Sequence, residues 1–320
     1  LLRERLAQPL SERFGESITG IEILEVQRRN YSTTIFVAVF TDRKTRRFVL
    51  KQIVRHPLNA SVLVGPNRCV VEYDILKELY PRFAAIERCS VPQPFVVLPE
   101  IDAFLMEFVE GHDLVGDLKF VHYLANRRML RQLQDHFHDC GTWLRHFQQF
   151  TGRRLASSSA LDNILVRCND RLSVVEQSRD PRCPREFRRI ATNYIEKQAR
   201  HLSGENILVT GRHGDFGPWN TLARADGITV FDFFNYQEDP QPVDIMGMLV
   251  YLECVSHGIA NSTHRIQLLR DCFLAGFGPL PELPHPLILL CEAMHRIRSV
   301  AGTVIIRTDV ATFGQPGFFG

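Results

Sequence analysis

This chain lacks any strong charge imbalance, any paired-cysteine motif and any long apolar run. Its 320 residues carry a net charge of +2, which argues neither for nor against any class of partner. The eight cysteines include no Cys-x-x-Cys pair, so we expect neither a zinc site nor a dense disulfide framework. Cys254 and Cys272 lie in apolar helical patterns and are predicted to be buried thiols. Free thiols are typical of the reducing cytoplasm, where we expect the protein to reside.

The absence of long apolar runs argues against a membrane span. The densest run, Leu287 to Cys291, follows Pro286 and ends at Glu292, well short of the roughly 20 residues that a spanning helix needs. It is predicted to begin a buried helix instead. Residues 1–6 are too charged for a signal peptide. The composition, with 45% hydrophobic and 23% charged residues, is that of an ordinary soluble globular protein.

The spacing of apolar residues changes along the chain from strand-like to helical. A short amphipathic helix is predicted within residues 1–18, and a helix at 67–80 is predicted to end before Pro81. Strands are predicted at 21–26, 33–40, 47–54, 95–98 and 103–109. We therefore predict an α+β fold with two lobes, divided near Glu110-Gly111. Residues 1–110 would form an N-lobe with a five-stranded antiparallel sheet and one helix, and residues 111–320 a mainly helical C-lobe.

One loop and the hairpin after it carry the strongest functional signal. Asp215 lies in a Gly- and Pro-bearing loop, five residues before Asn220, and such loops commonly carry functional side chains. Asn220 is predicted to open a short strand, with a hairpin turn at Asp226-Gly227. This hairpin would place Asn220 opposite Asp232 or Phe233, about 5 Å away. Asn220 and Asp232 could then share one Mg²⁺ ion, whose other ligands are usually waters and phosphate oxygens.

The order Asp-x4-Asn, hairpin, Asp resembles the catalytic and metal-binding segments of the aminoglycoside phosphotransferase family, which has a protein-kinase-like fold. His213-Gly214-Asp215 stands where protein kinases have His-Arg-Asp, and Asp232-Phe233-Phe234 departs from Asp-Phe-Gly as that family commonly does. The resemblance implies a kinase that transfers the γ-phosphate of ATP, or alternatively GTP, to a hydroxyl of a small molecule. Asp215 would orient and deprotonate the acceptor, and Asn220 and Asp232 would bind Mg²⁺. The alternative is a catalytically inactive, nucleotide-binding regulatory protein of the same fold.

The resemblance also implies a lysine and a glutamate that serve the nucleotide. Lys51, in the third predicted strand, would contact the α- and β-phosphates. Glu72, in the following helix, would hold that lysine through an ion pair. Asp74 and Glu78 lie on the same helix and could take the place of Glu72.

Two further segments would surround the nucleotide. The hairpin at 28–33 contains no glycine, but Ser32 and Thr33 could offer hydroxyls to the phosphates. Residues 106–111 resemble the hinge between the lobes, where the adenine edge would meet backbone groups from Glu107 to Val109.

Two residues near the loop are given supporting roles. His213 is expected to be a buried, hydrogen-bonded residue and not a second base. Asp244 belongs to a segment, 239–244, that resembles the family's Asp-Pro-x-x-Asp with one extra residue. We expect Asp244 to cap or support a helix and to brace the catalytic loop.

One feature of composition bears on the acceptor. Residues 121–200 contain fourteen arginines and one lysine against eight acidic residues, a surplus of +7. In this fold they would supply helices beside the acceptor cleft, and a polycationic aminoglycoside would need an acidic lining there. The surplus favours a neutral or anionic acceptor, such as a sugar or a sugar phosphate, while a solvated helix face explains it equally well. The expected partners are a nucleotide and this acceptor, without nucleic acid or membrane.

Overall fold

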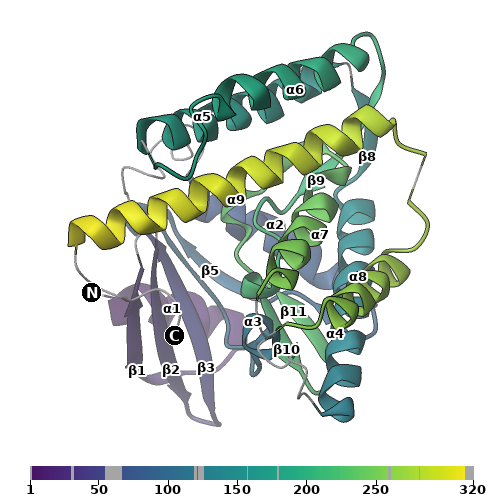
Figure 1. Ribbon diagram of the computed structural model, residues 1–320. Helices are drawn as coiled ribbons and strands as arrows, with labels where there is room; N and C mark the ends of the chain where they lie inside the picture. The colour runs from purple at the N-terminus through teal and green to yellow at the C-terminus, as the bar shows by residue number, and fades with distance from the viewer. Residues whose placement is uncertain are drawn as a thin grey trace.

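A sheet with helices on both of its faces forms the amino-terminal part of the molecule, and a larger helical part follows it (Figure 1). The structure is a computed structural model, and it describes residues 2–29, 32–54, 67–118, 121, 126–156, 158–178, 180–258, 261–280 and 282–313. The predicted phosphate hairpin therefore lies partly outside the described residues, because Asn30 and Tyr31 are not among them.

The amino-terminal sheet has five antiparallel strands in the order β1-β2-β3-β6-β5, as predicted. Their bounds are β1 Ile18–Arg28, β2 Ser32–Thr41, β3 Thr45–Ile53, β5 Pro94–Leu98 and β6 Ala103–Glu107. Successive side chains of a strand point to opposite faces. Phe48 and Leu50 therefore pack under helix α1 (Leu2–Phe14), whereas Ile53 packs with helix α2 (Arg68–Phe83). Lys51, two residues from Ile53, shares the α2 face.

Helix α2 continues past the proline that was predicted to end it. It begins at an N-cap, Asn67, whose side chain accepts a hydrogen bond from the amide of Cys69 at 3.1 Å. Pro81 lies in its last turn, and the helix runs on to Phe83. Phe83 is buried and stacks on Trp143 with ring centroids 5.2 Å apart. This packing outweighs the loss of a single amide donor so close to the helix end.

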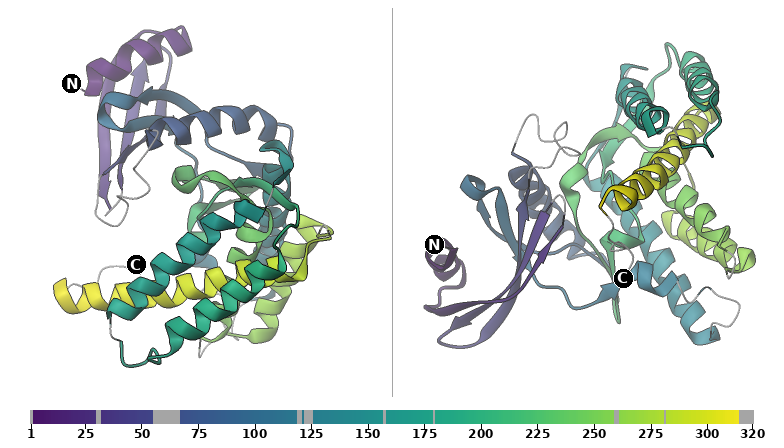
Figure 2. Two further views of the ribbon diagram at one scale, coloured as in Figure 1. Left: turned by 90° about the horizontal axis from the view of Figure 1, so that it is seen from above. Right: turned by 60° about the vertical axis from the view of Figure 1, so that its left-hand side comes forward.

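The carboxy-terminal part is built mainly from helices (Figures 1 and 2). They are α3 Leu114–Leu118, α4 Arg127–Phe150, α5 Asp162–Ser178, α6 Phe187–His201, α7 Pro242–Ser256, α8 Thr263–Phe277 and α9 His285–Phe313. The long helix α9 crosses this part of the molecule and packs against α5, α6 and α7. Its second half extends to the side where the amino-terminal sheet lies.

Two small sheets support the predicted catalytic segment. One has the order β4-β11-β10-β7, with β4 Cys89–Ser90, β7 His112–Asp113, β10 Thr221–Arg224 and β11 Gly227–Val230. The other has the order β12-β9-β8, with β8 Arg153–Ala156, β9 Ile207–Arg212 and β12 Gln237–Pro240. The loop at 213–220 therefore leaves one sheet at β9 and enters the other at β10.

The cysteine prediction is only partly right. Five cysteines are buried, but Cys254 is exposed and Cys272 is half-buried. Both lie on helices whose neighbouring residues are apolar, and Cys254 nevertheless points outward from α7. None of the helices in the described part of the chain has the length and apolar character needed to cross a membrane.

Candidate active site

The buried carboxylate of Asp244 holds the loop after β9 through hydrogen bonds. Asp244, in the first turn of α7, accepts hydrogen bonds from the amides of His213 at 2.7 Å and Gly214 at 3.1 Å. Gly214 has a φ of +83°, and a Cβ there would lie 2.6 Å from the carbonyl oxygen of Asn235, so only glycine suits this turn. Asp244 thus braces the loop, as the sequence predicted.

His213 is occupied on both ring nitrogens. Its Nε2 donates to the carbonyl oxygen of Phe231 at 3.0 Å, and its Nδ1 accepts from the amide of Asp215 at 3.3 Å. The side chain is fully buried, and burial lowers the pKa of His213. A neutral imidazole with both nitrogens engaged has no free position for a substrate proton, which confirms its expected supporting role.

Asp215 and Asn220 form a pair at the mouth of this loop. The Nδ2 of Asn220 donates to Asp215 Oδ2 at 3.0 Å and to the Asp215 carbonyl oxygen at 2.9 Å. The side chain of Asp215 is 25% exposed, whereas Asn220 is buried. Because the amide nitrogen is used in this way, the Asn220 Oδ1 is the atom that remains for a cation.

The hairpin register differs by one residue from the prediction. The strand begins at Thr221 and not at Asn220, and Thr221 pairs with Val230. The amide of Phe231 donates to the Asn220 carbonyl oxygen at 3.1 Å, so Asn220 lies opposite Phe231 and next to Asp232. The turn consists of Ala225 and Asp226, and Gly227, with a φ of +135°, already belongs to the return strand.

Lys51 joins two carboxylates from different parts of the chain. Its Nζ lies 2.8 Å from both oxygens of Glu72 and 2.6 Å from Asp232 Oδ1. The amide of Phe233 also donates to Glu72 Oε1 at 2.9 Å. Glu72 is fully buried and is the partner of Lys51; within the described residues, Asp74 and Glu78 make no ion pair with Lys51. The predicted pair Lys51–Glu72 is therefore present.

Asp232 itself has an unusual backbone. Its φ and ψ are 69° and 64°, a left-handed conformation that non-glycine residues rarely adopt. Such conformations cost roughly 1–3 kcal/mol and are concentrated at functional sites. In this conformation the Asp232 carboxylate pairs with Lys51.

Charge coupling sets the protonation of this cluster. Burial favours the neutral form of Lys51, but Asp232 and Glu72 outweigh it and raise the pKa of Lys51. Burial likewise opposes the charged form of Asp232, yet Lys51 brings the pKa of Asp232 below its usual value. Burial raises the pKa of Glu72 to about 7, against the opposing effect of Lys51. Lys51 and Asp232 are thus charged at neutral pH.

The remaining nucleotide candidates flank Lys51 on the sheet. Lys51 pairs with Thr34, so Thr33 lies one residue and Ser32 two residues farther along β2. Glu107 ends β6 opposite Phe48, and Val109 follows in the connection toward β7. The Glu107 amide already donates to the Gln93 carbonyl oxygen at 2.8 Å, so that group is occupied.

An arginine that the sequence did not single out reaches the predicted base. Arg298 Nη2, from α9, lies 2.5 Å from Asp215 Oδ1, and its Nη1 lies 3.5 Å from the Gly214 carbonyl oxygen. The two partners are 83 residues apart in the sequence. In the sequence, helical spacing places Arg298 three residues after His295, which is buried in the structure. That spacing alone does not indicate that Arg298 contacts Asp215.

The arginine surplus of residues 121–200 lies mostly on the outside. Among the described residues, arginines of α4, α5 and α6 are largely exposed. Several arginines of residues 121–200, on helices and between them, are paired with acidic residues: Arg154 with Glu238, Arg182 with Asp180, Arg188 with Glu176 and Arg189 with Glu186. The surplus is thus mainly a solvated helix surface and gives no information about an acceptor cleft.

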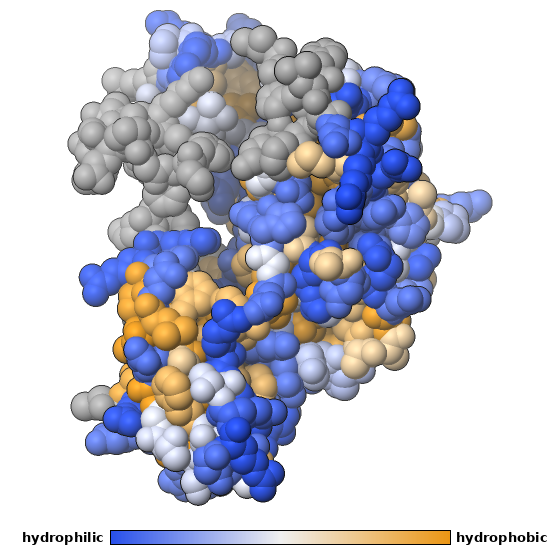
Figure 3. Space-filling model, turned by 90° about the horizontal axis from the view of Figure 1, so that it is seen from below, coloured by the Kyte–Doolittle hydropathy of each residue, from blue (hydrophilic) through white to orange (hydrophobic). Residues whose placement is uncertain are grey.

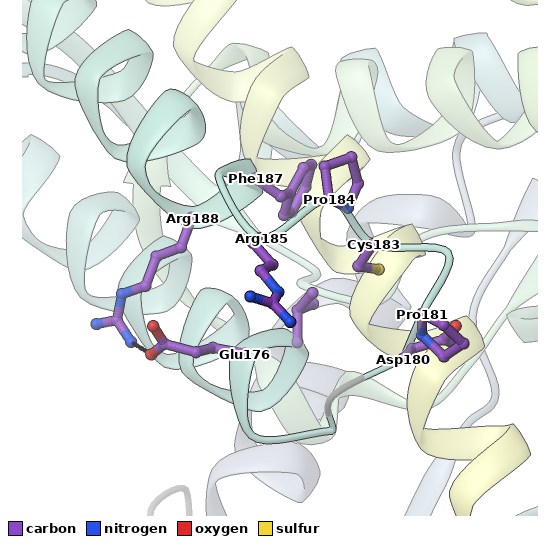
Figure 4. A pocket seen from close by; sticks show the side chains of 9 residues that line it. Glu176, Asp180, Pro181, Cys183, Pro184, Arg185, Phe187 and Arg188 are labelled. Atoms are coloured by element: carbon purple, nitrogen blue, oxygen red, sulfur yellow. Dashed lines mark hydrogen bonds and ion pairs between the residues drawn. The ribbon is translucent and has the colours of Figure 1, made fainter.

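A cavity of about 570 Å³ lies where α5 connects to α6 (Figure 4). Pro181, Cys183, Pro184 and Phe187 line it together with the ion pair of Glu176 and Arg188. None of the candidate site residues borders it. The candidate site around Asp215 is therefore separate from this cavity.

Comparison with known proteins gives a fold but no sequence family. No family model matches the chain, and no curated protein matches it by sequence. A glucosamine kinase in complex with glucosamine, ADP and inorganic phosphate has a TM-score of 0.57 at 14% identity, covering 92% of this chain and 81% of that one. A choline kinase from Streptococcus pneumoniae has a TM-score of 0.53 at 12% identity, covering 99% and 93%. A thermostable aminoglycoside phosphotransferase mutant has 0.52 at 12%, covering 96% and 94%. The chain therefore has the protein-kinase-like fold of these small-molecule phosphotransferases, as the resemblance implied.

Proposed function

We propose that this protein is a kinase that transfers the γ-phosphate of ATP to a hydroxyl group of a small molecule. One observation carries the proposal: the fold brings Lys51, Glu72 and Asp232 into contact and places Asp215 with Asn220 on the neighbouring loop. The likeness to structures of glucosamine kinase and choline kinase supports a small-molecule acceptor. Phosphoryl transfer needs mainly positioning and charge neutralisation, and this arrangement supplies groups for both.

In this proposal, Asp215 receives the proton of the acceptor hydroxyl. Asn220 fixes one carboxylate oxygen of Asp215, which holds the side chain in one orientation. A positioned base of this kind contributes typically 10²–10⁴-fold to rate. The Asp215 side chain is partly exposed, so a substrate can reach it.

The donor set at Asn220 and Asp232 suits Mg²⁺. The Asn220 Oδ1 and the Asp232 carboxylate are hard oxygen ligands on adjacent positions of one hairpin. When bound, the ion neutralises charge on the nucleotide phosphates. Lys51 would move from Asp232 to the α- and β-phosphates while Glu72 keeps hold of its ammonium group, because Glu72 contacts Lys51 with both oxygens.

The remaining assignments complete the nucleotide site. Ser32 and Thr33 would offer hydroxyls to the phosphates from β2, and the backbone from Glu107 to Val109 would meet the adenine edge. The division at Glu110-Gly111 would separate a nucleotide-binding lobe, 1–110, from a lobe with the acceptor site, 111–320. Reduced cysteines support a cytoplasmic protein.

A transfer screen tests the proposal. The protein would be incubated with Mg²⁺ and γ-labelled ATP against panels of sugars, amino alcohols, hydroxy acids and aminoglycosides. We expect labelled product with at least one panel, and none with the Asp232→Ala variant. Tight ATP binding by the parent protein without transfer to any acceptor or to water would contradict the proposal and leave an inactive nucleotide-binding regulator.

A further inference from the structure

Arg298 occupies the position beside the proposed base where part of the acceptor must lie. We propose that Arg298 selects acceptors that carry an anionic group, a carboxylate or a phosphate, close to the hydroxyl that is phosphorylated. This inference rests on the proposed function and adds the class of acceptor to it. Its starting point is the 2.5 Å contact between Arg298 Nη2 and Asp215 Oδ1.

The arginine that makes this contact lies on a helix that is anchored in the core. His295 lies one turn before Arg298 on the same face of α9, and its Nε2 donates to the Val243 carbonyl oxygen at 2.8 Å inside the core. Helix α7 approaches closely there, since a Cβ on Gly247 would lie 2.9 Å from His295 Cε1. Helix α9 is therefore anchored at the level of the active-site loop, and Arg298 has a defined place to project from.

Both oxygens of the Asp215 carboxylate have a partner. Asn220 donates to Oδ2 and Arg298 to Oδ1. A carboxylate has about four lone-pair positions, so a hydroxyl can still reach Oδ1, but it then lies next to the guanidinium group. Whatever substituent is attached near that hydroxyl is exposed to the charge of Arg298. A cationic substituent is disfavoured there, and an anionic one is attracted.

The nearby cations are engaged elsewhere. Arg212 and Arg167 both pair with Asp239, at 3.1 and 2.6 Å. Among the described residues, the carboxylate that Arg298 contacts is the proposed base itself, and 43% of the Arg298 side chain is exposed. An acceptor anion would give Arg298 a second partner, and the planar guanidinium suits carboxylate and phosphate alike.

The test compares acceptors in which a carboxylate replaces a neutral hydroxymethyl group. Glycerate with glycerol, and glucuronate with glucose, form two matched pairs, and glucosamine is a cationic probe. For each, kcat/KM would be measured with labelled ATP in the parent protein and in Arg298→Gln, Arg298→Lys and Arg296→Gln. Arg296 lies on the same helix and pairs with Glu253 and Glu292, so Arg296→Gln is the matched control. The anion-to-neutral ratio cancels any general effect on phosphoryl transfer.

We expect the parent protein to favour the anionic member of at least one pair by about 10-fold or more, the scale of one nearby opposite charge. Arg298→Gln should bring that ratio to about one, Arg298→Lys should retain part of it, and Arg296→Gln should leave it unchanged. A preference for neutral or cationic acceptors, or no preference, overturns the inference while the kinase proposal stands. A ratio that survives Arg298→Gln, with all rates reduced equally, would assign Arg298 to the transferred phosphoryl group instead. Absence of any transfer or ATP hydrolysis would overturn both.

Discussion

Lys51 and Asp232, 181 residues apart in the sequence, form a 2.6 Å ion pair that joins the amino-terminal sheet to the end of the β10-β11 hairpin. Glu72 holds the same ammonium group from α2. This arrangement makes the lysine a shared element of the two parts of the molecule. A nucleotide bound between them would compete with Asp232 for Lys51 and would leave Asp232 available to a cation.

The first prediction concerns Glu72. Glu72→Gln removes one of the two carboxylates on a buried lysine, and the loss of hydrogen bonds to a buried charged group is costly, so the free energy of unfolding should fall by about 1–3 kcal/mol. Phosphoryl transfer should fall by about 10-fold or more, since Lys51 is no longer held toward the phosphates. Denaturant unfolding and turnover would be measured together. Glu78→Gln, on the exposed side of α2, is the control, and equal behaviour of the two variants would exclude the role of Glu72.

The second prediction concerns the metal. Asp232→Ala should abolish the Mg²⁺ dependence of ATP binding, because it removes the charged ligand of the proposed pair. Calorimetric titration with and without Mg²⁺ would measure it. Asp226→Ala, in the turn of the same hairpin and 69% exposed, should bind like the parent. If Mg²⁺ enhances ATP binding in Asp232→Ala as strongly as in the parent, the ion is held by other residues.

The third prediction is a pH dependence of stability. Burial, assisted by the charge of Arg298, lowers the pKa of His295 from 6.5 to about 3. The unfolded chain therefore takes up a proton at a higher pH than the folded protein, so the contribution of His295 is present above pH 6.5 and is lost as pH falls toward 3. The loss between pH 7 and pH 5 should be about 2 kcal/mol. Unfolding by denaturant would be compared at the two pH values.

His295→Gln supplies the control for that measurement, because glutamine does not titrate. The free energy of unfolding of His295→Gln should fall less between pH 7 and pH 5 than that of the parent. The buried His213 contributes to the pH dependence of both proteins equally. Parallel decreases in the two proteins would show that His295 is not the group responsible.

Local patterns were enough to predict the strands of the amino-terminal sheet and the hairpin that follows Asn220. Strand alternation around Lys51 and a hairpin near Asp226-Gly227 depend on neighbours in the sequence. The structure has both, with the turn at Ala225-Asp226 and a one-residue shift at Asn220. Such features can be predicted because the two-residue side-chain period of a strand and the short loop of a hairpin allow few alternative registers.

Features set by packing between distant segments were not predictable in this way. The continuation of α2 past Pro81 depends on Phe83 meeting Trp143, and the exposure of Cys254 depends on which face of α7 is covered. Three apolar side chains of β1 are exposed, namely Ile23, Leu24 and Val26. Apolar surface is visible on the side of the molecule where this sheet lies (Figure 3). The Arg298–Asp215 contact likewise needs the path of α9 across the molecule.

We propose Asp215 as the acceptor base of a kinase, and the Asp215→Asn variant tests this role most directly. Asparagine keeps the size of the side chain but cannot accept the hydroxyl proton. With the best acceptor from the transfer screen, kcat should fall by roughly 10²-fold or more, while the affinity for Mg²⁺ and ATP, measured by calorimetry, stays within a few-fold of the parent. Turnover close to that of the parent protein would show that Asp215 is not the base.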